Sequence, residues 1–184
     1  VIYELNPYNP KVQPLIEMRM HFPREYEPFV RAARAEQGKA INYITYLGVR
    51  ETIVGKMEAQ RKQEASPRWQ ANYDLLFAQL VAYQARMFEY GACLEDFIDK
   101  PQTAPLTRKP NLTHVGWEIR TRQTLRQPDK VKPYIDRASE MFKAIIANHP
   151  STPWAARAEF ELKRGFGVEL IPDYDRPHPT PSGN

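Results

Sequence analysis

The clearest pattern in the chain is a run of apolar and aromatic positions within residues 69–97. Successive positions are alternately four and three residues apart: Trp69, Tyr73, Leu76, Leu80, Tyr83, Met87, Tyr90, Leu94 and Phe97. This is the period of a helix that packs along its whole length against another helix, and it continues for about four heptads. The run predicts a long helix whose aromatic side chains belong to the core rather than to a ligand groove.

A second amphipathic pattern precedes it, in residues 24–65. Its apolar positions recur at threes, fours and sevens: Ala33, Ala40, Ile44, Leu47, Val54 and Met57. Gly38, Gly48 and Gly55 lie inside the pattern, and each costs up to about 1 kcal/mol relative to alanine in a helix interior. Two interpretations stay open. Either the glycines make room for the rings of a facing helix, which we favour, or they break the helix into pieces.

The connection between the two patterns is short. Ser66 is a favoured N-cap residue, and Pro67 suits the first position of a helix. Because short connections join antiparallel neighbours, we predict a long helical hairpin over residues 24–98. In this hairpin Gly55 comes near Leu76 and Phe77, Gly48 near Tyr83, and Ala40 near Tyr90.

Prolines separate the hairpin from the segments on either side. Residues 1–23 contain Pro7, Pro10, Pro14 and Pro23, which predicts an extended lead-in with a short strand at 1–5. Residues 99–132 form a loop or extended segment. Within it, residues 111–122 alternate with the period of a strand and favour an extended segment anchored by Trp117. Leu112, Val115 and Ile119 would also suit a helical turn.

A second, shorter hairpin is predicted at residues 133–165. Its first helix follows Pro133 and ends at residues 148–150, with an apolar face of Ile135, Ala138, Phe142, Ile145 and Ile146. Its second helix starts at Thr152 and Pro153 and ends at Gly165. Residues 166–184 form an extended proline-rich tail, with an apolar stretch at 168–171. We therefore predict an all-α fold, one domain over 24–165, with extended termini that form a small strand pair.

Composition narrows the class of protein. Apolar residues make up 42% and charged residues 26% of the 184 residues, which predicts a soluble globular protein. The sequence has no run of 18 consecutive apolar residues, so we expect no membrane-spanning segment. The single cysteine, Cys93, excludes an internal disulfide, and the compartment stays open between the cytoplasm and a bacterial envelope. The N-terminus lacks Met and a signal-peptide pattern, so we interpret the chain as a piece of a longer protein.

No catalytic, metal or cofactor motif is present in the sequence. His21, His114, His149 and His178 have no ligand spacing, and the serines lie in no nucleophile motif. Glu95, Asp96 and Asp99 are interpreted as a solvated helix end rather than an acid–base pair. We therefore predict no enzyme activity and no cofactor.

Basic residues concentrate in one interval of the chain. The formal net charge is +4; residues 100–132 hold eight basic residues against two acidic ones, and the rest of the chain is close to neutral. Positive charge with an aromatic side chain can bind nucleic acid or another anionic surface. The candidate contacts are Trp117, Arg120, Arg122, Arg126, Lys130 and Lys132. The other interpretation is a solvated basic face, because no nucleic-acid-binding module is recognisable.

Two resemblances add to these predictions. Ala138, Phe142 and Pro150 match the spacing of the second helix of a tetratricopeptide repeat, so residues 122–165 resemble a tetratricopeptide-like hairpin. The order of Arg68-Trp69, Gly116-Trp117 and the closing run at 148–155 resembles the C-terminal helical region of uncharacterised bacterial proteins with a von Willebrand factor A domain. Both imply a non-catalytic scaffold or protein-interaction module with an unidentified protein partner. Nucleic-acid binding is the alternative.

Overall fold

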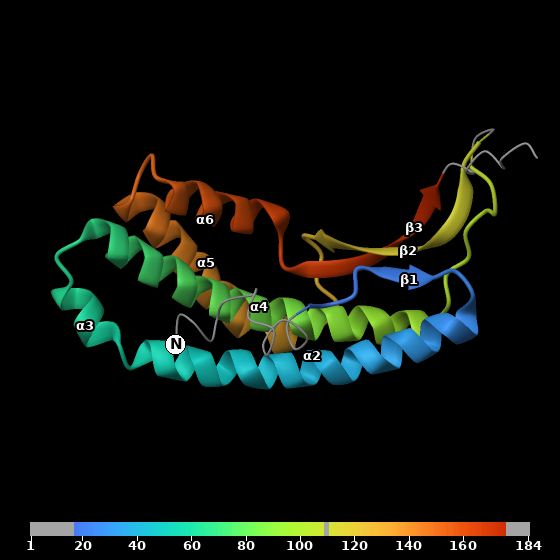
Figure 1. Ribbon diagram of the computed structural model, residues 1–184, viewed down its shortest axis with the longest axis horizontal. Helices are drawn as coiled ribbons and strands as arrows, with labels where there is room; N and C mark the ends of the chain where they lie inside the picture. The colour runs from blue at the N-terminus through green and yellow to red at the C-terminus, as the bar shows by residue number, and fades with distance from the viewer. Residues whose placement is uncertain (1–16, 109–110, 176–184) are drawn as a thin grey trace, which may run out of the picture.

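The computed structural model describes residues 17–108 and 111–175. These residues form five helices and a three-stranded antiparallel sheet (Figure 1). The predicted helical character is confirmed, but the all-α class is wrong in that it leaves out the sheet. The helices are α2 (Tyr26–Gly55), α3 (Glu58–Gln63), α4 (Pro67–Asp99), α5 (Pro128–Asn148) and α6 (Pro153–Arg164). The strands are β1 (His21–Pro23), β2 (Thr113–Arg122) and β3 (Gly167–Asp175).

Helices α2 and α4 form the long hairpin, with α3 at its turn (Figure 1). Helix α2 continues through Gly38 and Gly48 and ends at Gly55, so one of the three glycines marks a break. A Cβ on Gly55 would lie 3.6 Å from the Phe77 ring, and one on Gly48 would lie 3.5 Å from the Gln84 amide oxygen. The predicted contact of Gly55 is confirmed, and that of Gly48 is displaced by one residue.

Helix α4 is the centre of the fold, because α2, α5, α6 and β3 all contact it. Leu80, Tyr90, Leu94 and Phe97 of the predicted seam are buried. Trp69 is 56% exposed, so its predicted place in the core is wrong. It lies in the first turn of α4, and the partner helix that we expected to be continuous ends at Gly55, before the separate helix α3.

A second buried face of α4 was not predicted. It packs against α5 and α6 through small residues, namely Ala78, Val81 and Ala82, which cluster with Phe142 and Ala158. Alanine gives a weak signal in a hydrophobic pattern, and for that reason the seam of large residues hid this face. The packing makes α4 a helix enclosed on two sides.

The sheet covers the open end of the hairpin (Figure 1). Its order is β1-β2-β3, so the two outer strands both pair with β2, whereas we expected the extended termini to pair with each other. Trp117 and Ile119 point into the core, whereas an irregularity in pairing between His114 and Gly116 leaves Val115 exposed. The strand predicted at residues 1–5 and the tail from 176 onward lie outside the described residues.

Gly116 lets β1 approach β2 closely. A Cβ at this position would lie only 2.4 Å from the Phe22 carbonyl oxygen, which no other residue could tolerate without a shift of the backbone.

Helix α5 begins at Pro128, before the predicted start at Pro133. The buried carboxylate of Glu89 accepts hydrogen bonds from the backbone N–H groups of Arg126 and Gln127, at 2.8 to 3.0 Å. A side chain from α4 thereby satisfies amides at the start of α5. This long-range cap is invisible in the local sequence, and it explains why the start lies further upstream.

The ends of α6 match the prediction. The Thr152 hydroxyl accepts a hydrogen bond from the Ala155 N–H at 3.3 Å, and Gly165 follows the helix with a φ of 78°. None of the described helices has an apolar stretch long enough to cross a bilayer.

Candidate docking groove

A groove of about 370 Å³ lies between α2 and α5, with α4 as its floor. We call it the α2/α5 groove. Apolar and small residues make up most of its lining, and polar side chains lie at its edges. The lining consists of Gln37, Ala40, Ile41, Ile44, Met87, Phe88, Gly91, Ala92, Glu95, Gln127 and Lys130.

Helix periodicity explains how the sequence builds this groove. Ile41 and Ile44 are three residues apart and therefore share one side of α2, adjacent to the face that carries buried Ala40. Phe88, Gly91 and Ala92 have the same spacing on α4. Ile41 is 65% exposed, the largest exposed fraction among the exposed large apolar residues of the described chain.

One end of the groove is occupied by an ion pair. The Glu95 carboxylate accepts hydrogen bonds from Arg34 at 2.5 Å and from the Gln37 amide at 2.7 Å. These bonds, that from Gln37 first, hold the pKa of Glu95 below its ordinary value. Gln37 also donates to the Gly91 carbonyl at 3.2 Å, so it ties α2 to α4 at this level. The negative charge at this edge is thus already compensated within the chain.

Beyond the apolar part, a second polar contact joins the same three helices. Glu51 of α2 accepts a hydrogen bond from Gln84 of α4 at 2.6 Å and pairs with Arg137 of α5. Here too the carboxylate has its own partners. The stretch between the two polar contacts is apolar, with one charged exception.

That exception is Lys130, on the α5 wall. Its ammonium lies over the Phe88 ring, 4.3 Å from the ring centre. The described residues place no carboxylate within ion-pair distance of Lys130. The α2/α5 groove therefore combines apolar surface with one uncompensated cation.

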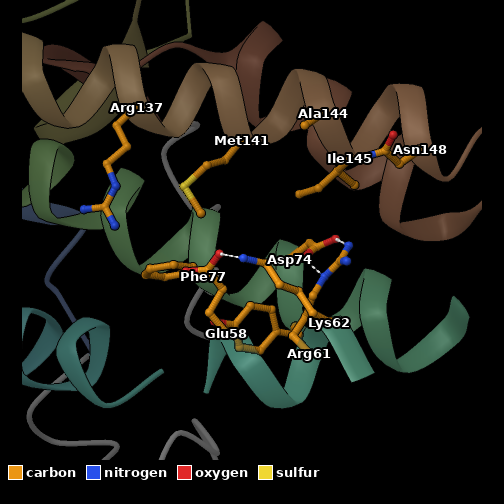
Figure 2. Close-up of a pocket in the computed structure, with 11 residues that line it drawn as sticks. Glu58, Arg61, Lys62, Asp74, Phe77, Arg137, Met141, Ala144, Ile145 and Asn148 are labelled. Carbon is orange, nitrogen blue, oxygen red and sulfur yellow. Dashed lines mark hydrogen bonds and ion pairs between the residues drawn. The ribbon is translucent and has the colours of Figure 1, made fainter. Parts of the chain in front are cut away.

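A second hollow, of about 420 Å³, lies between α3, α4 and α5 (Figure 2). Phe77, Met141 and Ile145 give it an apolar side. The charged groups that line it already have partners: Arg61 bonds Asp74 at 2.9 and 2.5 Å, and Lys62 pairs with Glu58 at 2.7 Å. The remaining one, Arg137, pairs with Glu51. No free charged group distinguishes this hollow, so we regard it as the weaker candidate site.

Most of the candidate contacts predicted from the sequence do not lie in the α2/α5 groove. Trp117 is 3% exposed, and its ring packs edge-on against Phe97 and His114, with centroids 4.8 and 4.9 Å apart. A nucleic-acid base therefore has no access to its face. Its predicted role as an anchor of the strand is consistent with this position.

The other predicted cations are spread over separate elements and are largely paired. Arg120 bonds Glu118 at 2.9 Å, and Lys132 pairs with Asp136 at 2.7 Å. Arg122 donates to the Thr124 carbonyl at 3.0 Å. Arg126 pairs with Asp96 at 2.7 Å and donates to the Val168 carbonyl at 3.2 Å. Of the six predicted residues, only Lys130 lies in the α2/α5 groove.

A buried ion pair on the other side of α4 was missed. Arg86 is 4% exposed and Glu161 is fully buried, and their side chains meet at 2.6 Å. Arg86 also donates to the Gly165 carbonyl at 3.2 and 3.1 Å. Burial alone would raise the pKa of Glu161, but the nearby guanidinium groups, that of Arg86 foremost, lower it below its ordinary value. Glu161 follows buried Ala158 by three residues, a core-facing spacing that could have revealed it.

The described residues show no arrangement for metal binding. No group of three or more His, Cys, Asp or Glu side chains in this part of the chain is placed to hold an ion. Cys93 is buried, and burial raises the pKa of its thiol, which disfavours the nucleophilic thiolate.

Comparison of the chain with protein-family models, with curated proteins and with solved structures gives no match. The resemblances to a tetratricopeptide-like hairpin and to proteins with a von Willebrand factor A domain therefore stay predictions.

Proposed function

We propose that this chain is a non-catalytic helical scaffold that binds another protein through the α2/α5 groove. The observation that carries the proposal is the exposed apolar surface of the groove, between α2 and α5 on the floor formed by α4. Ile41 projects from one wall, while Ile44, Met87 and Phe88 are only half-buried. Exposed apolar patches with polar edges are typical of interaction sites.

The polar edges support the same proposal. Glu95 and Glu51 have hydrogen-bond partners within the chain, so neither carboxylate needs a positively charged group from the bound protein. The walls belong to α2 and α5, which both pack on α4, and a groove that is formed before binding loses little conformational entropy on binding. These are features of a preformed docking surface.

A selection experiment tests this function although the partner is unidentified. A displayed library of helical peptides is selected on the full chain, and the peptides obtained are measured against Ile41→Glu. We expect affinity to fall at least about tenfold, because a charge enters an apolar contact. Val49→Glu is the matched control, since Val49 is also exposed on α2, at 53%, but does not line the groove.

The control defines the outcome. Peptides that bind wild type and Val49→Glu equally but lose affinity for Ile41→Glu support the proposal. If no peptide is selected, or if Ile41→Glu binds as well as wild type, the groove is not the docking surface.

Binding of nucleic acid or another anionic surface through residues 100–132 is the alternative proposal. Exposed Arg120 and Lys130 are the residues that favour it. Titration of duplex and single-stranded DNA at increasing salt tests it, because phosphate contacts weaken steeply with salt. Absence of binding at low salt would remove this alternative.

A further inference from the structure

We propose that the α2/α5 groove accepts a partner helix that places an apolar side chain on Gly91 and a carboxylate beside Lys130. This inference rests on the function proposed above and specifies the chemistry of the partner. It is carried by Gly91, a helix glycine in the lining of the groove, and by one uncompensated charge.

Nothing among the described residues explains the glycine at position 91. It lies in the interior of α4, where glycine costs up to about 1 kcal/mol relative to alanine. Its φ is not positive, because among the described glycines only Gly165 has a positive φ. A Cβ on Gly91 would meet no atom within 4 Å. Neither the backbone conformation nor the packing of the described residues requires glycine here.

Gly91 differs in this from the other glycines of the hairpin. A Cβ on Gly38 of α2 would also meet no atom of the described residues within 4 Å, but Gly38 does not line the groove. Gln37, which does line it, donates to the Gly91 carbonyl at 3.2 Å and ties α2 to α4 beside Gly91. Gly48 and Gly55 each face a side chain of α4, at 3.5 or 3.6 Å.

An open glycine in the floor of the groove lets a third backbone approach α4 closely. The distance between packed helices depends on the side chains at the crossing point, and glycine gives the shortest approach. Ile41 and Phe88 flank this point and offer apolar contact to a side chain of the incoming helix. The groove is therefore shaped for an apolar residue inserted between them.

Charge specifies the second contact. Glu95 is neutralised by Arg34, whereas Lys130 has no carboxylate partner among the described residues. A partner carboxylate would pair with Lys130 at the edge of an apolar surface, where the ion pair is less hydrated than in open water. The groove thus selects an acidic rather than a basic partner.

A pair of synthetic peptides tests the inference. One is an alanine-based helix of about 18 residues, long enough to be helical in water, with two leucines and a glutamate spaced one turn apart. Its twin has glutamine in place of the glutamate. Fluorescence anisotropy with the full chain should show the glutamate peptide binding about fivefold more tightly than the glutamine peptide.

Two variants assign this preference to the groove. Lys130→Gln should remove the difference between the peptides and leave the glutamine peptide unaffected. Lys132→Gln is the matched control, because Lys132 lies on the same helix but pairs with Asp136. Gly91→Leu should abolish binding of both peptides while its melting temperature does not fall, since the new side chain meets open space.

The outcomes are separable. Equal affinity for the two peptides, with binding still lost in Gly91→Leu, overturns the acidic partner but leaves the docking function intact. Unchanged binding by Gly91→Leu overturns the inference and, if the library also gives no groove-dependent peptide, the proposed function with it. A wild-type dimer in light scattering that Gly91→Leu converts to a monomer overturns the partner helix in favour of a second copy.

Discussion

The two sides of α4 differ in how they handle charge and space. On the side of α6, Arg86 and Glu161 are buried, bonded to each other at 2.6 Å and surrounded by further hydrogen bonds. On the side of the α2/α5 groove, Lys130 has no carboxylate partner among the described residues and Gly91 faces open space. Among the described residues, the charges of the first side are compensated, whereas that of Lys130 on the second side is not.

This difference predicts which substitutions affect the stability of the fold and which affect the binding of a partner. A buried charge must be compensated inside the fold, because leaving it unpaired costs several kcal/mol. An exposed lysine and an exposed isoleucine carry no such requirement. We therefore expect substitutions on the α6 side to change the free energy of unfolding, and substitutions in the groove to change binding alone.

The largest effect is expected for Arg86→Met. This change leaves Glu161 buried without its main cation and should lower the free energy of unfolding by about 3–5 kcal/mol. Urea denaturation measures it. Arg157→Met is the control, because Arg157 also pairs with Glu161, at 2.6 Å, but is 43% exposed. Equal effects of the two variants would contradict the special role of the buried pair.

The next largest effect on stability is expected when leucine replaces Gly48 of α2, compared with the same replacement of Gly91 in α4. Gly48→Leu must displace Gln84, whose amide oxygen lies 3.5 Å from the new Cβ, and should cost about 1–3 kcal/mol. For a chain of this size each kcal/mol corresponds to a fall in melting temperature of about 2–4 °C. Gly91→Leu should show no fall. A melting temperature for Gly48→Leu equal to wild type would refute the register of the hairpin.

Acid should weaken the α6 side in a defined pH range. The pKa of Glu161 is lowered in the folded chain relative to its ordinary value of 4.5. The unfolded chain therefore binds a proton at a higher pH, and the stabilisation by Glu161 is full above 4.5 and is lost as the pH falls through the folded pKa. Free energies of unfolding from neutral pH downward should decline less steeply for Glu161→Gln. Parallel curves for the two proteins would contradict the shift.

The smallest effect on stability is expected for Lys130→Gln. An exposed lysine without an ion pair contributes little, so the free energy of unfolding should change by no more than about 0.5 kcal/mol. Chemical denaturation of this variant and of Lys132→Gln provides the comparison. A loss above that size would mean that Lys130 serves the fold rather than a partner.

Local patterns in the sequence predicted much of the fold. The spacing of large apolar residues located the hairpin of α2 and α4, and Thr152 and Gly165 marked the ends of α6. Features that depend on distant contacts were not predictable in this way. Glu89 caps α5 from another helix, and the irregular pairing near Gly116 turns Val115 to solvent.

The candidate site was only partly accessible from the sequence. Lys130 belongs to the predicted basic residues. Counting charges cannot show that Arg126 and Lys132 have carboxylate partners whereas Lys130 has none among the described residues. Gly91 lies within the predicted seam helix, and its local sequence does not show whether a neighbouring side chain fills the space beside it. Only the arrangement of α2, α4 and α5 brings these residues together.

Hydrogen exchange of the full chain with and without the glutamate peptide tests the docking groove most directly. Binding in the groove predicts slower exchange in residues 37–44 and 87–95, with no change around Arg86 and Glu161. Gly91→Leu should show no such slowing at the same peptide concentration. Slower exchange confined to residues 58–74 and 137–148, which line the other hollow, would contradict the α2/α5 groove as the docking surface.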